Sequence, residues 1–173
     1  VLIEHRNLVQ YVAGVSSRLE LPPGASYALV STFAADLGNT VLYGSLLGGG
    51  HLHVMGEERT KDPHAIAEYF SRNPIDCLKI VPSHLSALLE SPNAAAVVPH
   101  KRLVVGGEAS SWELVEKLRA LRPEHVLFNH YGPTETTVGV LTNRVGERRS
   151  DAPIVPLGRP LPNTTLYVLD RHG

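Results

Sequence analysis

Residues 129–137 combine side chains that suit the handling of a nucleotide. The run Asn-His-Tyr-Gly-Pro-Thr-Glu-Thr-Thr is too polar for a core, and its Gly-Pro pair gives a fixed bend. Tyr131 can stack on a base, Thr134 can donate to a phosphate oxygen, and Glu135 can hold Mg²⁺. On residue types alone, a capped turn in which Thr and Glu satisfy a helix amino terminus is an equally good interpretation.

Three further residues could bind charged groups, although each also has an ordinary interpretation. Lys79 lies in the run Cys-Leu-Lys-Ile-Val, where an alternating strand turns its charge either inward or out to water. Taken alone, an exposed Lys79 is favoured. His130 alone fits a loop histidine bonded to backbone, and Asp36 alone fits a helix N-cap.

The elements that must position these residues alternate between helix and strand. Caps and amphipathic spacing predict helices over 6–18, 39–47, 62–70, 83–89 and 110–121. Apolar runs of strand length predict strands over 27–33, 51–55, 77–81, 103–105, 126–128, 137–142 and 165–169. Such alternation with short connections predicts an α/β fold with a mainly parallel sheet covered by helices.

Local signals define several helix starts and buried faces. Asp62 followed by Pro63 begins one helix, and Ser83 is expected to cap the next. Ser110 with Glu113 forms a capping-box pattern before the last helix. In the first helix, the spacing predicts an apolar side made of Leu8, Val9, Val12 and Val15.

In a parallel sheet, ligands bind beyond the carboxyl ends of the strands. The segments that directly follow the predicted strands are therefore the places to expect chemistry. They are Ala34–Thr40, Pro82–His84, Gly106–Ala109 and Asn129–Thr137.

Composition excludes several classes of protein. The chain has 173 residues, enough for one cored domain, with 43% hydrophobic and 19% charged residues. A net charge of -1 with intermixed acids and bases offers no basic stripe for nucleic acid. No run approaches the ~20 apolar residues that span a bilayer, so no membrane association is expected. A single cysteine, Cys77, excludes an intrachain disulfide and favours a reducing compartment such as the cytoplasm.

The motif Asn129-x-Tyr-Gly-Pro-Thr-Glu135 closely resembles that of the adenylate-forming superfamily, specifically the adenylation domains of nonribosomal peptide synthetases. Other segments match this family in order. The stretch 1–8 resembles the one after the phosphate-binding loop, and 106–109 resembles the strand end against adenine. The stretches 157–163 and 167–170 resemble the approach to the next motif. The resemblance covers essentially the whole chain and implies part of the large N-terminal subdomain, with some β-structure at its carboxyl end.

The resemblance implies ATP and Mg²⁺ as the cofactors for activating a carboxylate as an acyl adenylate. It implies catalytic roles for Thr134 at the α-phosphate and Glu135 on Mg²⁺, with Tyr131 stacked on adenine and Asn129 reading its amino edge. The nucleotide-binding set is Gly106, Gly107, Glu108, Ala109, Asn129, His130, Tyr131, Gly132 and Thr134.

The resemblance also implies that residues 1–173 are a single internal fragment, an expectation that the missing initiator Met supports. The family's phosphate-binding loop is expected before Val1, and its small C-terminal subdomain with the catalytic Lys after Gly173. We therefore expect the fragment alone to be inactive. The implied partners are a carrier protein with its phosphopantetheine thiol and the neighbouring synthetase domains. A role for a small activator protein stays open.

By the same resemblance, Asp36 holds the α-ammonium of an amino acid. Phe33-Ala-Ala-Asp36 departs here from the commoner Phe-Asp-x-Ser arrangement. The side-chain pocket is lined by Leu37, Thr40, Lys79, Val104, Gly106, His130, Val138 and Gly139. A cationic Lys and a donor His around a small cavity favour an anionic side chain. Aspartate is predicted first and β-hydroxy- or β-methylaspartate second, ahead of asparagine and glutamate.

Two alternatives stay open from the sequence. An acyl- or aryl-CoA ligase of the same superfamily uses carboxylates without an α-ammonium, which leaves Asp36 without an ionic partner. A non-catalytic nucleotide-binding or docking module uses the fold as a scaffold, and the ordered match of residues needed for chemistry argues against it.

Overall fold

One seven-stranded sheet organises the computed structural model, which describes residues 1–148 and 151–173. Its strand order is β2-β1-β3-β4-β5-β6-β7. The parallel strands are β1 (Ser26–Leu29), β2 (His51–Val54), β3 (Cys77–Ile80), β4 (Arg102–Gly106) and β5 (Val126–Tyr131). β6 (Leu141–Arg144) and β7 (Arg159–Pro160) join by antiparallel pairing. The predicted fold class is confirmed.

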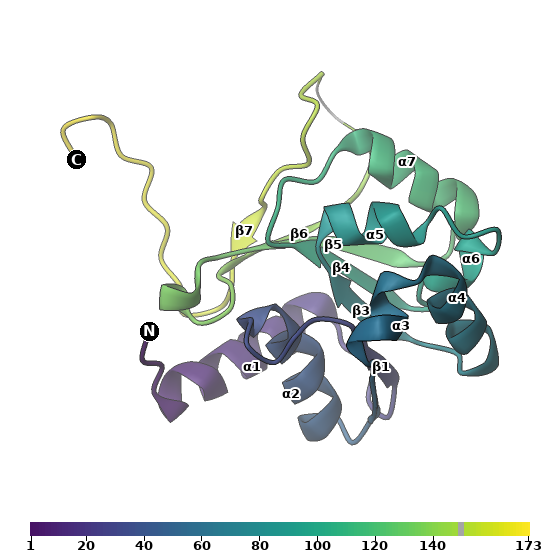
Figure 1. Cartoon of the computed structure of the whole chain (residues 1–173). Coiled ribbons are helices and arrows are strands. Elements are labelled where there is room, and N and C mark those ends of the chain that lie inside the picture. The colour runs from purple at the N-terminus through teal and green to yellow at the C-terminus, as the bar shows by residue number, and fades with distance from the viewer. Residues whose placement is uncertain (149–150) are drawn as a thin grey trace.

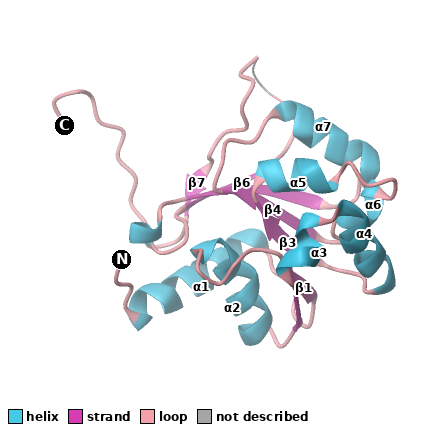
Figure 2. Ribbon diagram, in the orientation of Figure 1, coloured by secondary structure: helices cyan, strands magenta, loops and turns pink. Residues whose placement is uncertain are grey.

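Helices cover both faces of this sheet (Figures 1 and 2). On one face lie α1 (His5–Leu19) and α2 (Asn39–Leu47). On the other lie α4 (Pro63–Arg72), α5 (Pro82–Leu88), α6 (Ala94–Val97) and α7 (Trp112–Leu121), after the short α3 (Glu57–Lys61). Two 3-10 turns, η1 (Asp36–Gly38) and η2 (Thr134–Thr136), follow β1 and β5.

The core on the α4–α7 face is mainly apolar. Alternate strand residues point to opposite faces, so each strand contributes every second side chain to it. β3 contributes Leu78 and Ile80 to this cluster, and β4 contributes Leu103 and Val105. They pack against apolar residues of α4, α5 and α7, including Ile66, Leu85 and Leu118. Fully burying one such side chain stabilises the fold by about 1.5–3 kcal/mol.

The predicted helices formed with small shifts at their starts. Asp62 caps α4 as predicted, accepting hydrogen bonds from the backbone N–H groups of residues 64 and 65. The expectation for Ser83 was wrong, because the residue lies inside α5 and its hydroxyl donates to Glu108. Ser111 rather than Ser110 caps α7, because the Ser111 hydroxyl accepts from the Leu114 N–H, whereas Ser110 Oγ has no hydrogen-bond partner among the described residues.

The apolar side of α1 is also shifted from the prediction. Val9 is 68% exposed, whereas Tyr11 is buried beside Val12 and Val15. Positions 8, 11, 12, 15 and 19 lie on one side of a helix with 3.6 residues per turn, and position 9 lies away from them. Tyr11 therefore points toward the sheet.

Two β-strand expectations near the carboxyl end were wrong. The predicted strand over 137–142 begins only at Leu141, because Thr137 and Val138 adopt left-handed backbone conformations with φ of 67° and 65°. The stretch 165–169 forms no strand and is exposed, with Val168 95% accessible. Conversely, β5 continues through Tyr131, so Asn129 to Tyr131 are strand residues rather than loop residues.

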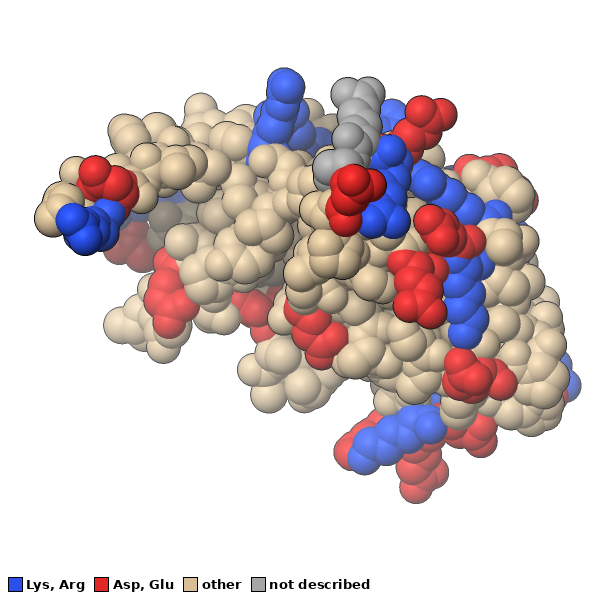
Figure 3. Space-filling view, turned by 90° about the horizontal axis from the view of Figure 1, so that it is seen from above, with Lys and Arg blue, Asp and Glu red and all other residues tan. Residues whose placement is uncertain are grey.

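The surface charge is mixed in sign, and the single cysteine is buried, as expected from the sequence. Figure 3 shows acidic and basic side chains close together, without a large area of one sign on the face in view. Cys77 is a free, buried thiol, and burial raises its pKa to about 12. Among the described residues, no helix combines the length and apolarity needed to cross a membrane.

Candidate functional site

Two neighbouring cavities lie where the parallel strands end. The first has a volume of about 290 Å³ and is reached by η1, β3 and β5. The second, about 360 Å³, lies along the ends of β4 and β5. Gly107 and Gly132 line both cavities, so the two spaces adjoin. After the ligands predicted from the sequence for their lining residues, we call the first the amino-acid cavity and the second the nucleotide cavity.

Five of the predicted substrate residues line the amino-acid cavity: Asp36, Leu37, Lys79, His130 and Val138. The other four do not line the cavity and instead lie next to Lys79 or His130. Thr40 bonds to Lys79, Val104 pairs with Lys79 across the strands, Gly106 pairs with His130, and Gly139 lies against the His130 ring.

Lys79 is buried with its ammonium group inside the protein. Only 1% of the residue is exposed, so the alternative of a surface lysine does not hold, and Lys79 lies at the cavity, as the resemblance implied. Its Nζ donates to Thr40 Oγ1 at 2.7 Å and to His130 Nδ1 at 2.8 Å. An ammonium has three donors, which leaves one N–H for a ligand. Burial lowers the Lys79 pKa to about 7, partly opposed by the Asp36 carboxylate.

The register of the sheet explains how Lys79 reaches His130. β4 lies between β3 and β5, pairing Val104 with Lys79 and Gly106 with His130. All four residues belong to the same face of the sheet, and Gly106 has no side chain to block the path. The long lysine side chain can therefore cross β4 to the imidazole.

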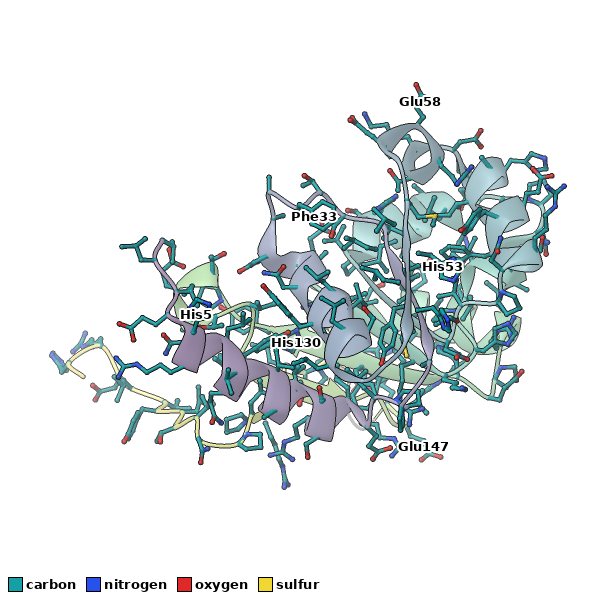
Figure 4. The ribbon with its side chains drawn as sticks, turned by 90° about the horizontal axis from the view of Figure 1, so that it is seen from below. His5, Phe33, His53, Glu58, His130 and Glu147 are labelled. Carbon is teal, nitrogen blue, oxygen red and sulfur yellow. The ribbon has the colours of Figure 1, made fainter. Side chains whose placement is uncertain are left out.

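His130 is a neutral donor in this arrangement. Its Nδ1 accepts from Lys79, so its single ring proton lies on Nε2. Burial, followed by the nearby Lys79 charge, holds the pKa of His130 well below its usual range. Its Nε2 is buried and has no partner among the described residues. Figure 4 shows His130 near the middle of the molecule, beside α1 and α2.

Asp36 supplies the negative group of the same cavity. Its Oδ2 is buried and has no hydrogen-bond partner within residues 1–148 and 151–173. The N-cap interpretation is not observed, because Ala35 precedes η1 and Gly38 precedes α2. Phe33, by contrast, is 67% exposed and lies at the outer edge in Figure 4. The cavity therefore holds an unpaired carboxylate oxygen and an incompletely used ammonium group.

The nucleotide cavity contains most of the nucleotide-binding residues predicted from the sequence. They are Gly107, Glu108, Ala109, Asn129, Tyr131 and Gly132. Tyr131 is 47% exposed, so part of its ring is accessible at the cavity. The Asn129 side-chain amide donates to the carbonyl oxygens of Val155 and Pro156, at 3.3 and 3.1 Å. Its own carbonyl oxygen is the group left for a base edge.

Thr134 and Glu135 lie on η2, next to both cavities but outside them. Thr134 lines a third cavity of about 310 Å³ that shares Asp36 and Val138 with the amino-acid cavity. Glu135 is exposed and lines none of these three cavities. In the part of the chain that is described, no three His, Cys, Asp or Glu side chains converge to hold a metal.

Several lining residues were not predicted as site residues. His84 belongs to a segment that strand ends had marked for chemistry, and its Nε2 bonds the Thr60 carbonyl at 2.7 Å. Ile154 and Leu157 also line the nucleotide cavity. Leu157 begins the stretch 157–163 that resembles the approach to a family motif, but the resemblance gave it no site role, and Ile154 carries no local signal. Tyr11 bonds to Thr40, and its helical spacing marks it only as a core residue.

The fold is that of an α/β protein with two cavities at the carboxyl edge of a mainly parallel sheet, the edge at which such sheets usually bind ligands. The sequence profile of the family described as AMP-binding enzyme matches residues 1–173, and the chain belongs to this family.

Curated relatives extend this assignment. Bacitracin synthase 3 of Bacillus licheniformis is 34% identical over 179 residues, covering 99% of this chain and 3% of that protein. Surfactin synthase subunit 2 of Bacillus subtilis (strain 168) is 35% identical over 175 residues, covering 98% of this chain and 5% of that protein. The chain therefore spans only a few per cent of the length of these relatives.

Solved structures show the same fold. A four-domain nonribosomal peptide synthetase bound to AMP and glycine matches with a TM-score of 0.85 and 31% identity, over 98% of this chain and 12% of that one. The synthetase FmoA3 in its AMPPNP-bound form matches with a TM-score of 0.90 and 25% identity, over 99% of this chain and 19% of that one.

Proposed function

We propose that this chain is part of an adenylation domain that activates aspartate, or a β-substituted aspartate, as aminoacyl-AMP for nonribosomal peptide synthesis. One observation carries the proposal. The buried Lys79 ammonium keeps one unused donor in a cavity that also contains the unpaired Asp36 carboxylate oxygen.

The cavity offers a counter-charge to two of the three charged groups of aspartate. Asp36 would receive the α-ammonium, and Lys79 the side-chain carboxylate, with the His130 Nε2–H as a second donor, and the cavity lining and the unpartnered atoms of Asp36 and His130 support this. Leaving one member of a buried ion pair without its partner costs about 3–5 kcal/mol. Asparagine or an aliphatic side chain would leave Lys79 in that state, which favours an acidic substrate.

The α-carboxylate of the substrate would then lie toward Gly107 and Gly132, which line both cavities. With ATP in the nucleotide cavity, a carboxylate oxygen attacks the α-phosphorus, and the bond from that phosphorus to pyrophosphate breaks. Tyr131 would stack on adenine, and Thr134 would donate to the α-phosphate. AMP and AMPPNP in the two related synthetase structures support a nucleotide of this kind.

Glu135 fits the Mg²⁺ that normally accompanies ATP. Mg²⁺ is usually bound through one or two protein carboxylates together with phosphates and water, rather than by an all-protein cage. An exposed carboxylate beside Thr134 meets that requirement. The bound ion would neutralise phosphate charge, and Glu135 would position it.

The remaining parts of the activity lie in the domain to which we assign this chain. We propose that residues 1–173 form the middle of its N-terminal subdomain, with a phosphate-binding loop and a C-terminal subdomain supplied by adjoining sequence. The adenylate would pass to the phosphopantetheine thiol of a carrier protein. We expect no adenylation by these residues alone, because the positive groups that meet the developing charge are supplied elsewhere.

Amino-acid-dependent pyrophosphate exchange by the complete adenylation domain tests the proposal. We expect the highest kcat/KM with aspartate or β-hydroxyaspartate, lower values with asparagine and glutamate, and none with aryl or fatty acids. Lys79→Met should lower kcat/KM for aspartate by about 10²- to 4 × 10³-fold, the equivalent of the broken pair. Exchange with aryl or fatty acids would instead indicate the CoA-ligase alternative, and an unchanged preference in Lys79→Met would contradict the pocket assignment.

A further inference from the structure

Tyr11 lies outside the amino-acid cavity but is bonded to the residues that hold Lys79. The phenol is on α1, is 4% exposed, and does not line the cavity. Its oxygen lies 2.6 Å from Thr40 Oγ1, which accepts from Lys79 Nζ. Its ring centroid lies 5.9 Å from that of His130, at an interplanar angle of 42°. Tyr11 thus contacts both residues that fix the ammonium.

The direction of the Tyr11–Thr40 hydrogen bond follows from what else the phenol can reach. Thr40 is the only hydrogen-bond partner of the Tyr11 hydroxyl among the described residues. If Thr40 donated, the buried phenol proton would have no acceptor, and an unsatisfied buried donor is costly. Burial raises the pKa of Tyr11, so the phenol keeps its proton. Tyr11 therefore donates, and Thr40 accepts from both Tyr11 and Lys79.

The position of Lys79 depends on this arrangement. The charged and titratable groups around its Nζ are His130 on β5, Asp36 on η1 and, through Thr40 on α2, Tyr11 on α1. A threonine hydroxyl can rotate, and the Tyr11 donor fixes which side of the oxygen stays available to Lys79. Without that donor, one of the two acceptors that orient the ammonium is released.

We propose that Tyr11 is a positioning residue for amino-acid selectivity, which fixes Thr40 as an acceptor and so directs the free N–H of Lys79 at the acidic side chain of the substrate. The inference rests on the proposed function, since it assigns a further residue to the recognition of aspartate. Tyr11 lies in neither the amino-acid cavity nor the nucleotide cavity, so inspection of their linings does not find it.

Tyr11→Phe in the complete adenylation domain tests the inference by pyrophosphate exchange. We expect KM for aspartate to rise about twofold to tenfold, in line with one lost neutral hydrogen bond, with kcat nearly unchanged. The preference for aspartate over asparagine should fall by a similar factor. The alkaline limb of kcat/KM for aspartate should move to lower pH, because an ammonium with one fewer fixed acceptor loses its proton more easily.

Tyr69→Phe is the matched control. It also removes a hydroxyl that makes a hydrogen bond, here to His53 Nδ1 at 3.0 Å, but it lies on α4 away from the cavity. Its KM, selectivity and pH limb should equal those of the wild type. A merely structural role of Tyr11 would alter thermal stability without moving the pH limb, and that result would overturn the inference.

Two further comparisons separate the possible failures. If the wild-type domain does not prefer aspartate, the proposed function fails and this inference fails with it. If the wild type prefers aspartate but Tyr11→Phe keeps its selectivity, the inference alone is overturned. Thr40→Val replaces Tyr11→Phe if that variant does not fold. It removes the acceptor itself and should show the same changes, and wild-type behaviour of Thr40→Val would also overturn the inference.

Discussion

The two faces of the central sheet are equally buried but chemically different. Toward α4–α7, β3 and β4 present Leu78, Ile80 and Leu103 to an apolar cluster, each at most 1% exposed. Toward α1 and α2, β3 and β5 present Lys79 and His130, which are 1% and 2% exposed. The same alternation of residues thus places these apolar side chains on one face and a buried ammonium with its imidazole partner on the other. Figure 1 shows the helices that cover each face.

The two faces of the sheet therefore contribute differently, one to the stability of the fold and the other to ligand recognition. Apolar burial on the α4–α7 face stabilises the fold at no electrostatic cost. Burial of an ammonium on the other face is unfavourable unless a counter-charge completes it, and the lowered Lys79 pKa reflects that cost. If position 79 served only the hydrophobic core, an apolar residue there would give a higher free energy of unfolding. The ammonium is therefore best explained by a ligand that pairs with it.

Lys79→Met should have the largest effect, because it removes the buried charge that distinguishes the α1–α2 face of the sheet from the other face. Without aspartate, the Lys79 ammonium is charged in both folded and unfolded chains below about pH 7, so its full burial cost is present there. Between about 7 and the ordinary value of 10.5, only the unfolded chain keeps the proton, so wild-type unfolding free energy rises with pH. From pH 6 to pH 10 the wild type should gain roughly 3–4 kcal/mol relative to Lys79→Met.

Chemical denaturation of the complete domain at several pH values measures this change. Lys61→Met is the control, because its ammonium lies on the surface, paired with Glu57. Its difference from the wild type should stay within about 1 kcal/mol at each pH below 10. Parallel stability curves for wild type and Lys79→Met would contradict a buried, shifted lysine.

Leu103→Ala should have the next largest effect, and it tests whether a change on the α4–α7 face alters stability without altering substrate recognition. Leu103 is completely buried between β3 and β5, so its removal should lower the unfolding free energy by about 2–5 kcal/mol. KM for aspartate should stay unchanged in the folded variant, because the side chain points away from the cavity. A loss of aspartate selectivity at unchanged stability would contradict the separation of the two faces.

Gly139→Ala should have a smaller effect, at the point where the loop after η2 meets His130. A Cβ at this position would lie 2.6 Å from His130 Nε2, so the imidazole or the loop must shift. We expect a stability loss of about 1–3 kcal/mol and a higher KM for aspartate. Gly146→Ala is the matched control, because a Cβ there meets no atom of residues 1–148 or 151–173 within 4 Å. Equal KM values for the two variants would show that His130 tolerates displacement.

Much of the fold was predictable because local physics and tertiary structure agree. Asn39–Leu47 was predicted with its observed bounds, since glycines follow it, and Asp62 with Pro63 marked the start of α4 correctly. The wrong secondary-structure predictions lie where contacts with distant residues, rather than the local sequence, determine the backbone conformation. Residues 165–169 form an apolar run that pairs with none of the described strands. Val138 takes a left-handed conformation that a β-branched residue rarely adopts.

The site was predictable to the extent that strand ends and family motifs point to it. Asp36, Lys79 and His130 come together as the resemblance implied, although each alone had a simpler interpretation. Tyr11 was not predictable, because its helical position marks only a buried side chain. Its role depends on a partner 29 residues away, on another helix, which no local pattern encodes.

Proton uptake on aspartate binding tests the central claim that Lys79 pairs with an anionic group of the substrate. Near pH 8 most of the buried lysine should be neutral in the free domain, since its pKa is about 7. A bound carboxylate would raise that pKa, so calorimetry in buffers of different ionisation enthalpy should show uptake of close to one proton per aspartate. Lys79→Met should show none. Aspartate binding to the wild type without proton uptake would contradict the account.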